Sequence, residues 1–127
     1  MVNQYQYARG VGKGHRRKRM TVRFSQNEIR FRVMPSELDE IIAGRTLDLA
    51  SYPLQFQIAS GKKRSVDKLS LRVDGLKLFL EISRDELELL RSRLPSRDGI
   101  EEVVQLESGL ELNISFEVDV KAKRRDL

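Results

Sequence analysis

The residues best suited to chemistry lie near the end of the chain, where Glu117, Asp119 and Lys121 occupy alternate positions. Alternate side chains of a β-strand point to the same face of its sheet, so all three would project together. Carboxylates can bind a divalent cation, and a lysine can hold a phosphate. The spacing therefore predicts a candidate catalytic set. The same pattern is also typical of the solvent side of an amphipathic sheet, where opposite charges pair across strands.

This alternation resembles the Glu-x-Glu-x-Lys strand of the triphosphate-tunnel enzymes. The resemblance implies a phosphate- or metal-dependent hydrolase in which the carboxylates bind metal and Lys121 holds phosphate. The chain departs from that family, because the motif opens those enzymes and closes this sequence. Basic side chains at outward positions of other expected strands would line such a face: Arg23, Arg30, Arg32, Arg72 and Lys77.

Histidine and cysteine chemistry is restricted by composition. The single histidine, His15, lies in a segment without apolar periodicity, and the chain contains no cysteine. A general base must be held in a fixed geometry, which such a segment does not provide. Disulfides and cysteine-ligated metals are excluded. We therefore predict a protein without a cofactor or a metal site, and one that is not an enzyme.

The net charge of +5 is unevenly distributed along the chain. Residues 1–19 carry six basic and no acidic side chains, and residues 121–127 carry four basic and one acidic. The remainder has 14 basic and 18 acidic side chains, a balance of −4. High net charge with low hydrophobicity predicts disorder. We therefore expect disordered basic tails at 1–19 and 121–127 around one domain at 20–120.

The tails provide a candidate nucleic-acid or anion site. Its basic residues are Arg16, Arg17, Lys18, Arg19, Lys123, Arg124 and Arg125. Binding through such tails would be weak, non-specific and steeply dependent on salt. Two other interpretations of residues 1–19 stay open: a solvated tail, and an upstream start codon that precedes a native start at Met20.

The elements that position these residues follow from a repeat. Residues 20–44 read as two alternating apolar strands, a turn and a short amphipathic helix. The same outline recurs 49 residues later, where Asp74-Gly75 favours a hairpin turn. Ser36 with Asp39, and Ser83 with Glu86, have the spacing of helix capping boxes.

Beyond the repeat, the pattern predicts strands at 54–58, 103–106 and 110–120, with loops at 45–53 and 60–65. The total of about seven strands and two short helices predicts an α+β domain. We expect a mostly antiparallel sheet with the helices packed on one face. The strands at 54–58 and 110–120 are the expected free edges for a partner strand.

Three stretches resemble a bacterial domain family of unknown function. They are MTVRFSQNEIRFRVMPSEL, Asp74-Gly75-Leu76-Lys77-Leu78 and the closing strand at 109–120. Members open with Met-Lys-Ile/Leu-Arg and an Ile/Leu-Arg-Leu-Arg-Leu strand. The resemblance implies a fold and supports Met20 as the domain start, but it implies no activity. The family usually starts where Met20 stands here and often continues into an acidic tail.

These features predict an uncharacterised bacterial protein that acts as a non-catalytic binding or regulatory module. Its partner would be an unknown protein or a second copy. Phe79 faces away from Leu78 and Leu80, so it is a candidate partner anchor; the alternative is burial beneath loop 45–53. No apolar run approaches the roughly 20 residues that span a bilayer. The basic N-terminal segment is not followed by a secretory apolar region. We expect a cytoplasmic protein that does not bind membranes.

Overall fold

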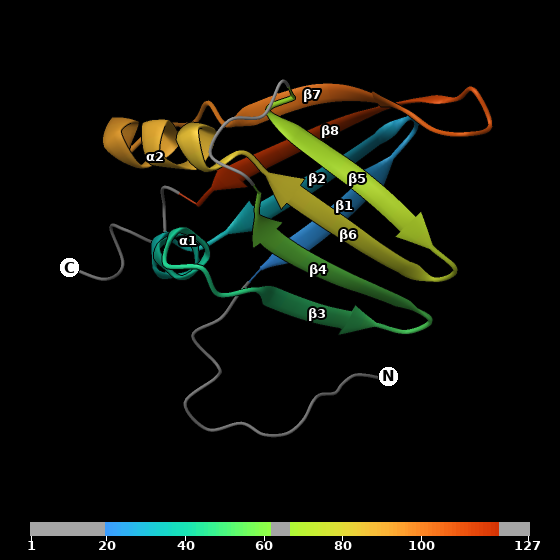
Figure 1. The fold of residues 1–127 in the computed structure, drawn as a ribbon, viewed down its shortest axis with the longest axis horizontal. Helices are drawn as coiled ribbons and strands as arrows, with labels where there is room; N and C mark the ends of the chain where they lie inside the picture. Colours follow the sequence, from blue (N-terminus) through green and yellow to red (C-terminus); the bar gives the residue numbers. More distant parts are fainter. Residues whose placement is uncertain (1–19, 62–66, 120–127) are drawn as a thin grey trace.

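The computed structural model describes residues 20–61 and 67–119. Within these ranges, eight strands form two sheets of four strands each, accompanied by two helices (Figure 1). Sheet A has the order β1-β2-β8-β7: Thr21–Ser25, Glu28–Val33, Glu111–Val118 and Ile100–Gln105. Sheet B has the order β3-β4-β6-β5: Leu47–Ser51, Leu54–Ser60, Lys77–Ile82 and Leu69–Asp74. The helices are α1, Pro35–Ile42, and α2, Arg84–Arg93.

The two halves of the chain exchange hairpins between the sheets. The first half gives β1–β2 to sheet A and β3–β4 to sheet B, and the second half gives β5–β6 to sheet B and β7–β8 to sheet A. Each sheet is therefore mixed, with two antiparallel hairpins joined by a central parallel pair. The pairing is equivalent in both sheets, since Phe31 lies opposite Phe116 and Leu80 lies opposite Ile58.

The α+β class is confirmed, but the prediction of a single sheet of about seven strands is wrong, and each of the two sheets combines antiparallel pairs with one parallel pair. The missing strand is β3, in the segment expected to be a loop. Its alternation is limited to Leu47 and Leu49 and stops at a turn containing Pro53, which gives only a short apolar signal. The expected free edges, β4 and β8, are central strands; the edges are β1, β7, β3 and β5.

The hydrophobic core lies between the sheets. Several inward-facing side chains near the middle of the central strands are at most 2% exposed, as expected for residues that alternate toward a neighbouring sheet: Phe31, Phe56, Ile58, Leu80, Ile114 and Phe116. The apolar face of each sheet is therefore covered by the other sheet. The prediction that the helices pack on one face of the sheet is wrong.

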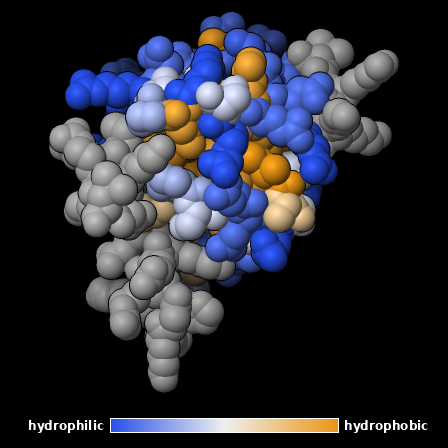
Figure 2. Space-filling view, turned by 90° about the vertical axis from the view of Figure 1, so that its left-hand side faces the viewer, coloured by the Kyte–Doolittle hydropathy of each residue, from blue (hydrophilic) through white to orange (hydrophobic). Residues whose placement is uncertain are grey.

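The helices instead close one end of the sandwich, on the left of Figure 1, which we call the helix end. Helix α1 follows β2 and α2 follows β6, so both leave the sheets where these strands finish. Their inward-facing residues Leu38, Ile41, Leu87 and Leu90 are fully buried. Asp39 and Arg91 form an ion pair of 2.8 Å between the helices. Figure 2 views this end and shows mainly hydrophilic side chains, with smaller apolar patches between them.

All four hairpin turns lie at the opposite end, on the right of Figure 1, because each parallel central strand starts from its own hairpin turn. We call this the turn end and define it by residues 25–28, 51–54, 74–77 and 105–111. In the part of the chain that the structure describes, neither helix reaches it. Neither helix has the length and hydrophobicity needed to span a bilayer.

Candidate functional site

Glu117 lies on the outer face of sheet A, where it pairs with arginines of β2. Its Oε1 accepts hydrogen bonds from Nε and Nη2 of Arg32 at 3.1 and 2.9 Å, and its Oε2 lies 3.8 Å from Nε of Arg30. Arg32 is the direct cross-strand neighbour of Glu117. Asp119 follows the end of β8 and donates its backbone N–H to the Val33 carbonyl at 2.8 Å. Lys121 lies outside the described residues.

The basic side chains expected to line one face lie on two different faces. Arg23, Arg30 and Arg32 alternate with inward-facing residues of β1 and β2, so they lie on the outer face of sheet A. Arg72 and Lys77 contact Phe79 on the outer face of sheet B. The space between the sheets is apolar, and no group of three metal-binding side chains occurs among the described residues. This arrangement does not resemble a charged tunnel.

Phe79 is half-buried on the outer face of sheet B. The Arg72 guanidinium carbon lies 4.0 Å from its ring centroid, and Lys77 Nζ lies 5.0 Å from it, both within cation–π range. Segment 45–53 contains β3, which is separated from β6 by β4 in sheet B. The role of Phe79 as a partner anchor stays a prediction. The tail residues Arg16–Arg19 and Lys123–Arg125 lie outside the described residues.

A different candidate surface lies at the turn end. Five large apolar side chains in these turns or directly beside them are between 51% and 85% exposed; we call them the turn-end patch: Phe24, Tyr52, Val73, Leu76 and Leu110. Phe24 pairs with Ile29 in the β1–β2 hairpin, and Val73 pairs with Leu78 in the β5–β6 hairpin. Phe24 and Val73 therefore lie on the inward-facing side of their sheets but remain exposed to solvent. Chemically, the patch can bind another apolar surface.

The turn-end patch is continuous with the core. The Phe24 ring centroid lies 5.9 Å from that of Phe56, which lies 6.1 Å from that of Phe31. These distances suit favourable aromatic pairs and form a row from the surface to the buried interior. Gly75 has a φ of +63°, a conformation that favours glycine, and this turn presents Leu76 at the tip of the β5–β6 hairpin.

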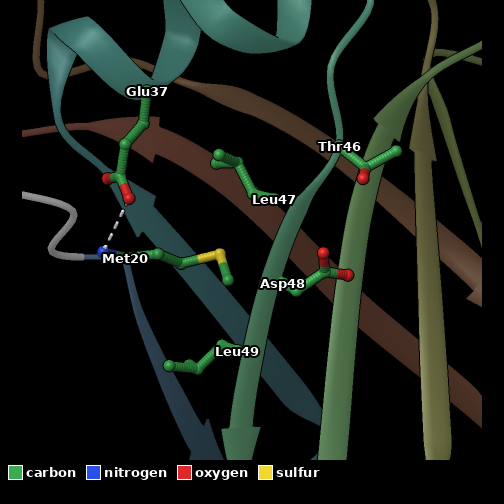
Figure 3. A pocket seen from close by; sticks show the side chains of 6 residues that line it. All are labelled: Met20, Glu37, Thr46, Leu47, Asp48 and Leu49. Atoms are coloured by element: carbon green, nitrogen blue, oxygen red, sulfur yellow. Dashed lines mark hydrogen bonds between the residues drawn. The ribbon is translucent and has the colours of Figure 1, made fainter. Parts of the chain in front are cut away.

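A hollow of about 180 Å³ lies where β1 begins, beside β3 and α1 (Figure 3). Its lining is Met20, Glu37, Thr46, Leu47, Asp48 and Leu49. Glu37 is only 1% exposed, and its carboxylate accepts the backbone N–H groups of Met20 at 3.2 Å and Met34 at 2.8 Å. These bonds hold the beginnings of β1 and α1 together, which explains this buried acid structurally.

Sequence reasoning missed Glu37. It expected Ser36 and Asp39 to cap α1, whereas the helix begins at Pro35 and Glu37 bonds back to Met34. Proline at the first helical position, with glutamate in the first turn, was the available signal. Helix α2 starts after Ser83 as expected, but the Ser83 side chain makes no capping hydrogen bond.

No protein-family model, curated protein or solved structure matches this chain. The resemblance to a bacterial domain family of unknown function therefore stays an expectation. Among the surfaces described above, the turn-end patch contains most of the exposed large apolar side chains of the described residues.

Proposed function

We propose that this chain is a non-catalytic protein-binding module and that the turn-end patch is its binding surface. The observation that carries the proposal is that five of the seven exposed large apolar side chains among the described residues lie in or next to the hairpin turns, at the end of the sandwich opposite the helices. Clustered apolar patches on a soluble surface mark interaction sites, whereas scattered apolar residues do not.

The size of the patch suits the centre of an interface. From the exposed fractions of its side chains, the patch presents roughly 500 Å² of apolar surface. A standard protein interface buries about 800 Å² on each partner, with an apolar centre and a polar rim. Tyr52, the most exposed member, belongs to a residue type enriched at interface centres.

The charged side chains support binding rather than catalysis. Glu117 pairs with Arg30 and Arg32, and Asp39 pairs with Arg91 across the two helices. Such cross-strand and inter-helix pairs are typical of a stabilised surface. We also propose, from the sequence alone, that the module acts in the bacterial cytoplasm.

Affinity capture with matched variants tests the proposal. The wild-type chain, the double variant Leu76→Ser/Leu110→Ser and the control variant Leu89→Ser are immobilised and exposed to the same cell extract. Leu89 is a suitable control because it is exposed to a similar extent but lies on α2, at the other end. Proteins retained by the wild type and the control but lost with the double variant support the proposal. Identical sets of retained proteins from the wild type, the double variant and the control variant would contradict it.

A second candidate function is accessory binding of nucleic acid through the basic terminal segments. It is favoured by the charge of +6 over residues 1–19 and +3 over residues 121–127. The full chain would bind with a steep salt dependence, and the chain shortened to residues 20–120 would not bind. A filter-binding titration at several salt concentrations distinguishes the two. Equal binding by both forms would place the nucleic-acid site on the folded domain instead.

A further inference from the structure

We propose that two copies of this chain pack together through the outer faces of their sheets A. This inference goes beyond the proposed function, because it concerns a different surface and names its occupant. The outer face of sheet A consists of the side chains on β1, β2, β8 and β7 that point away from the core. The observation that carries the inference is the distribution of charge over these four strands.

The two halves of this face have opposite charge. Strands β1 and β2 contribute three basic side chains and one acidic side chain, a balance of +2: Arg23, Arg30, Arg32 and Glu28. Strands β8 and β7 contribute three acidic side chains and no basic one, a balance of −3: Glu111, Glu117 and Glu101. A surface divided in this way can complement a second copy of itself.

The described segments next to these strands do not reverse the difference. Glu107 in the β7–β8 turn and Asp119 after β8 are also acidic, so they add to the negative half. Arg97 and Asp98, which precede β7, carry opposite charges. The division into a basic half and an acidic half therefore remains when the neighbouring charges are counted.

The ion pairs within the chain lie in the middle of the face, and its outer strands keep unpaired charges. Glu117 pairs with Arg32 at 2.9 Å, and Glu28 pairs with Arg30 at 3.3 Å. Arg23 on β1 and Glu101 on β7 form no ion pair with another described residue. Arg23 also lies directly opposite Arg30, and like charges in that position are unfavourable.

The strand register shows how a second copy fits. Arg23, Arg30, Ser115 and Glu101 form one row across the sheet. A twofold axis parallel to the strands reverses the strand order of the second copy and keeps each row. Arg23 then faces Glu101 of the second copy, and in the next row Arg32 faces Glu117 of the second copy. An axis perpendicular to the strands would instead place Arg23 against Arg23, so charge selects the first arrangement.

Two other side chains on this face support a contact. Ser115 is 6% exposed, and its Oγ has no hydrogen-bond partner among the described residues. Buried hydroxyl groups are normally paired, and Arg30 of the second copy, which faces Ser115, provides a donor. Val103 on β7 is 58% exposed and lies outside the turn-end patch. Strand β1 of the second copy would cover it.

The size of the face sets the expected affinity. Four strands of about six residues cover a projected area of roughly 350 Å². This is small beside the roughly 800 Å² that a standard interface buries on each partner. We therefore expect a weak dimer, with a dissociation constant of roughly 10–100 μM. The affinity should fall as salt rises, since screening weakens exposed charge pairs.

Sedimentation equilibrium of the full chain tests the inference with variants of reversed charge. Arg23→Glu alone and Glu101→Arg alone should each weaken dimerisation at least about tenfold. A mixture of these two variants should form a dimer again, because glutamate at position 23 of one variant faces arginine at position 101 of the other. Arg93→Glu is the control, since Arg93 is exposed on α2, and it should leave dimerisation unchanged.

Recovery in the mixture also shows that both variants fold. A wild-type chain that stays monomeric at concentrations well above the expected constant would overturn the inference. So would a dimer that neither Arg23→Glu nor Glu101→Arg weakens. A dimer that is lost only with Leu76→Ser/Leu110→Ser would place the second copy on the turn-end patch, which overturns this inference and supports the proposed function. Failure of the capture experiment would remove the proposed function and leave this dimer unaffected.

Discussion

The two ends of the sandwich differ in whether their inward-facing apolar side chains are buried. At the helix end, α1 and α2 bury Leu38 and Leu90 completely. At the turn end, Phe24 and Val73 occupy inward-facing positions and are still more than half exposed. An inward-facing position is therefore not sufficient for burial, because a side chain also needs cover. In our account a partner provides that cover at the turn end.

The largest expected effect is at the helix end. Leu90→Ala should lower the free energy of unfolding by about 2–5 kcal/mol, because it removes buried apolar contacts and leaves a cavity. Leu89→Ala, one residue earlier and exposed, should change it by less than about 0.5 kcal/mol. Urea denaturation of both variants measures the difference. Equal losses would show that α2 does not seal the core as described.

The buried carboxylate beside the hollow should have the next largest effect. Glu37→Ala leaves the buried Met20 N–H and the partly buried Met34 N–H without this acceptor, and we expect a loss of about 1–3 kcal/mol. Glu37→Gln retains one carbonyl acceptor and should lose less. Urea denaturation of the pair tests whether hydrogen bonding, rather than volume, explains the burial of this acid. Equal losses in both variants would contradict that explanation.

The outer face of sheet A should contribute little. A double-mutant cycle on Arg32→Ala and Glu117→Ala should give a coupling of about 0.5–1 kcal/mol, because the pair is partly exposed. The coupling should decrease in high salt. If removal of Glu117 instead abolished phosphate or metal binding, the interpretation of this pair as structural would be wrong.

The expected effect on stability per residue is smallest at the turn end. Leu76→Ser/Leu110→Ser should change the free energy of unfolding by no more than about 0.5 kcal/mol for each residue, because both side chains are already exposed in the folded chain. Thermal and urea denaturation measure this change. A loss of several kcal/mol would mean that these residues belong to the core rather than to a binding surface.

Local pattern predicted the hairpins and helices of the repeat but not their assembly. Alternation identifies Ile29, Phe31 and Val33 as facing a core, and the equivalent positions of β6 begin 49 residues later. It does not show that β2 pairs with β8 from the other half, because that contact is distant in sequence. The structure therefore has two mixed sheets instead of the single expected sheet, because each half of the chain contributes one hairpin to each sheet.

The turn-end patch could not be predicted from the sequence for a related reason. Phe24, Val73 and Leu110 continue the apolar alternation of the neighbouring strands, so the sequence alone does not distinguish them from core residues. Only the three-dimensional arrangement shows that the helices lie at one end of the sandwich and leave these side chains at the other end exposed. The charged set near the C-terminus was visible in sequence, and the arginine opposite Glu117 gives a structural explanation for that one member.

The most direct test of the central claim is site-specific photo-crosslinking in cells that produce the full chain. A photoreactive phenylalanine analogue replaces Leu76 or Leu110 at the turn end, or Leu89 at the helix end. We expect discrete protein adducts from the two turn-end positions and none from position 89. Adducts from position 89 alone, or equal adducts from all three, would contradict the assignment of the turn end as the binding surface.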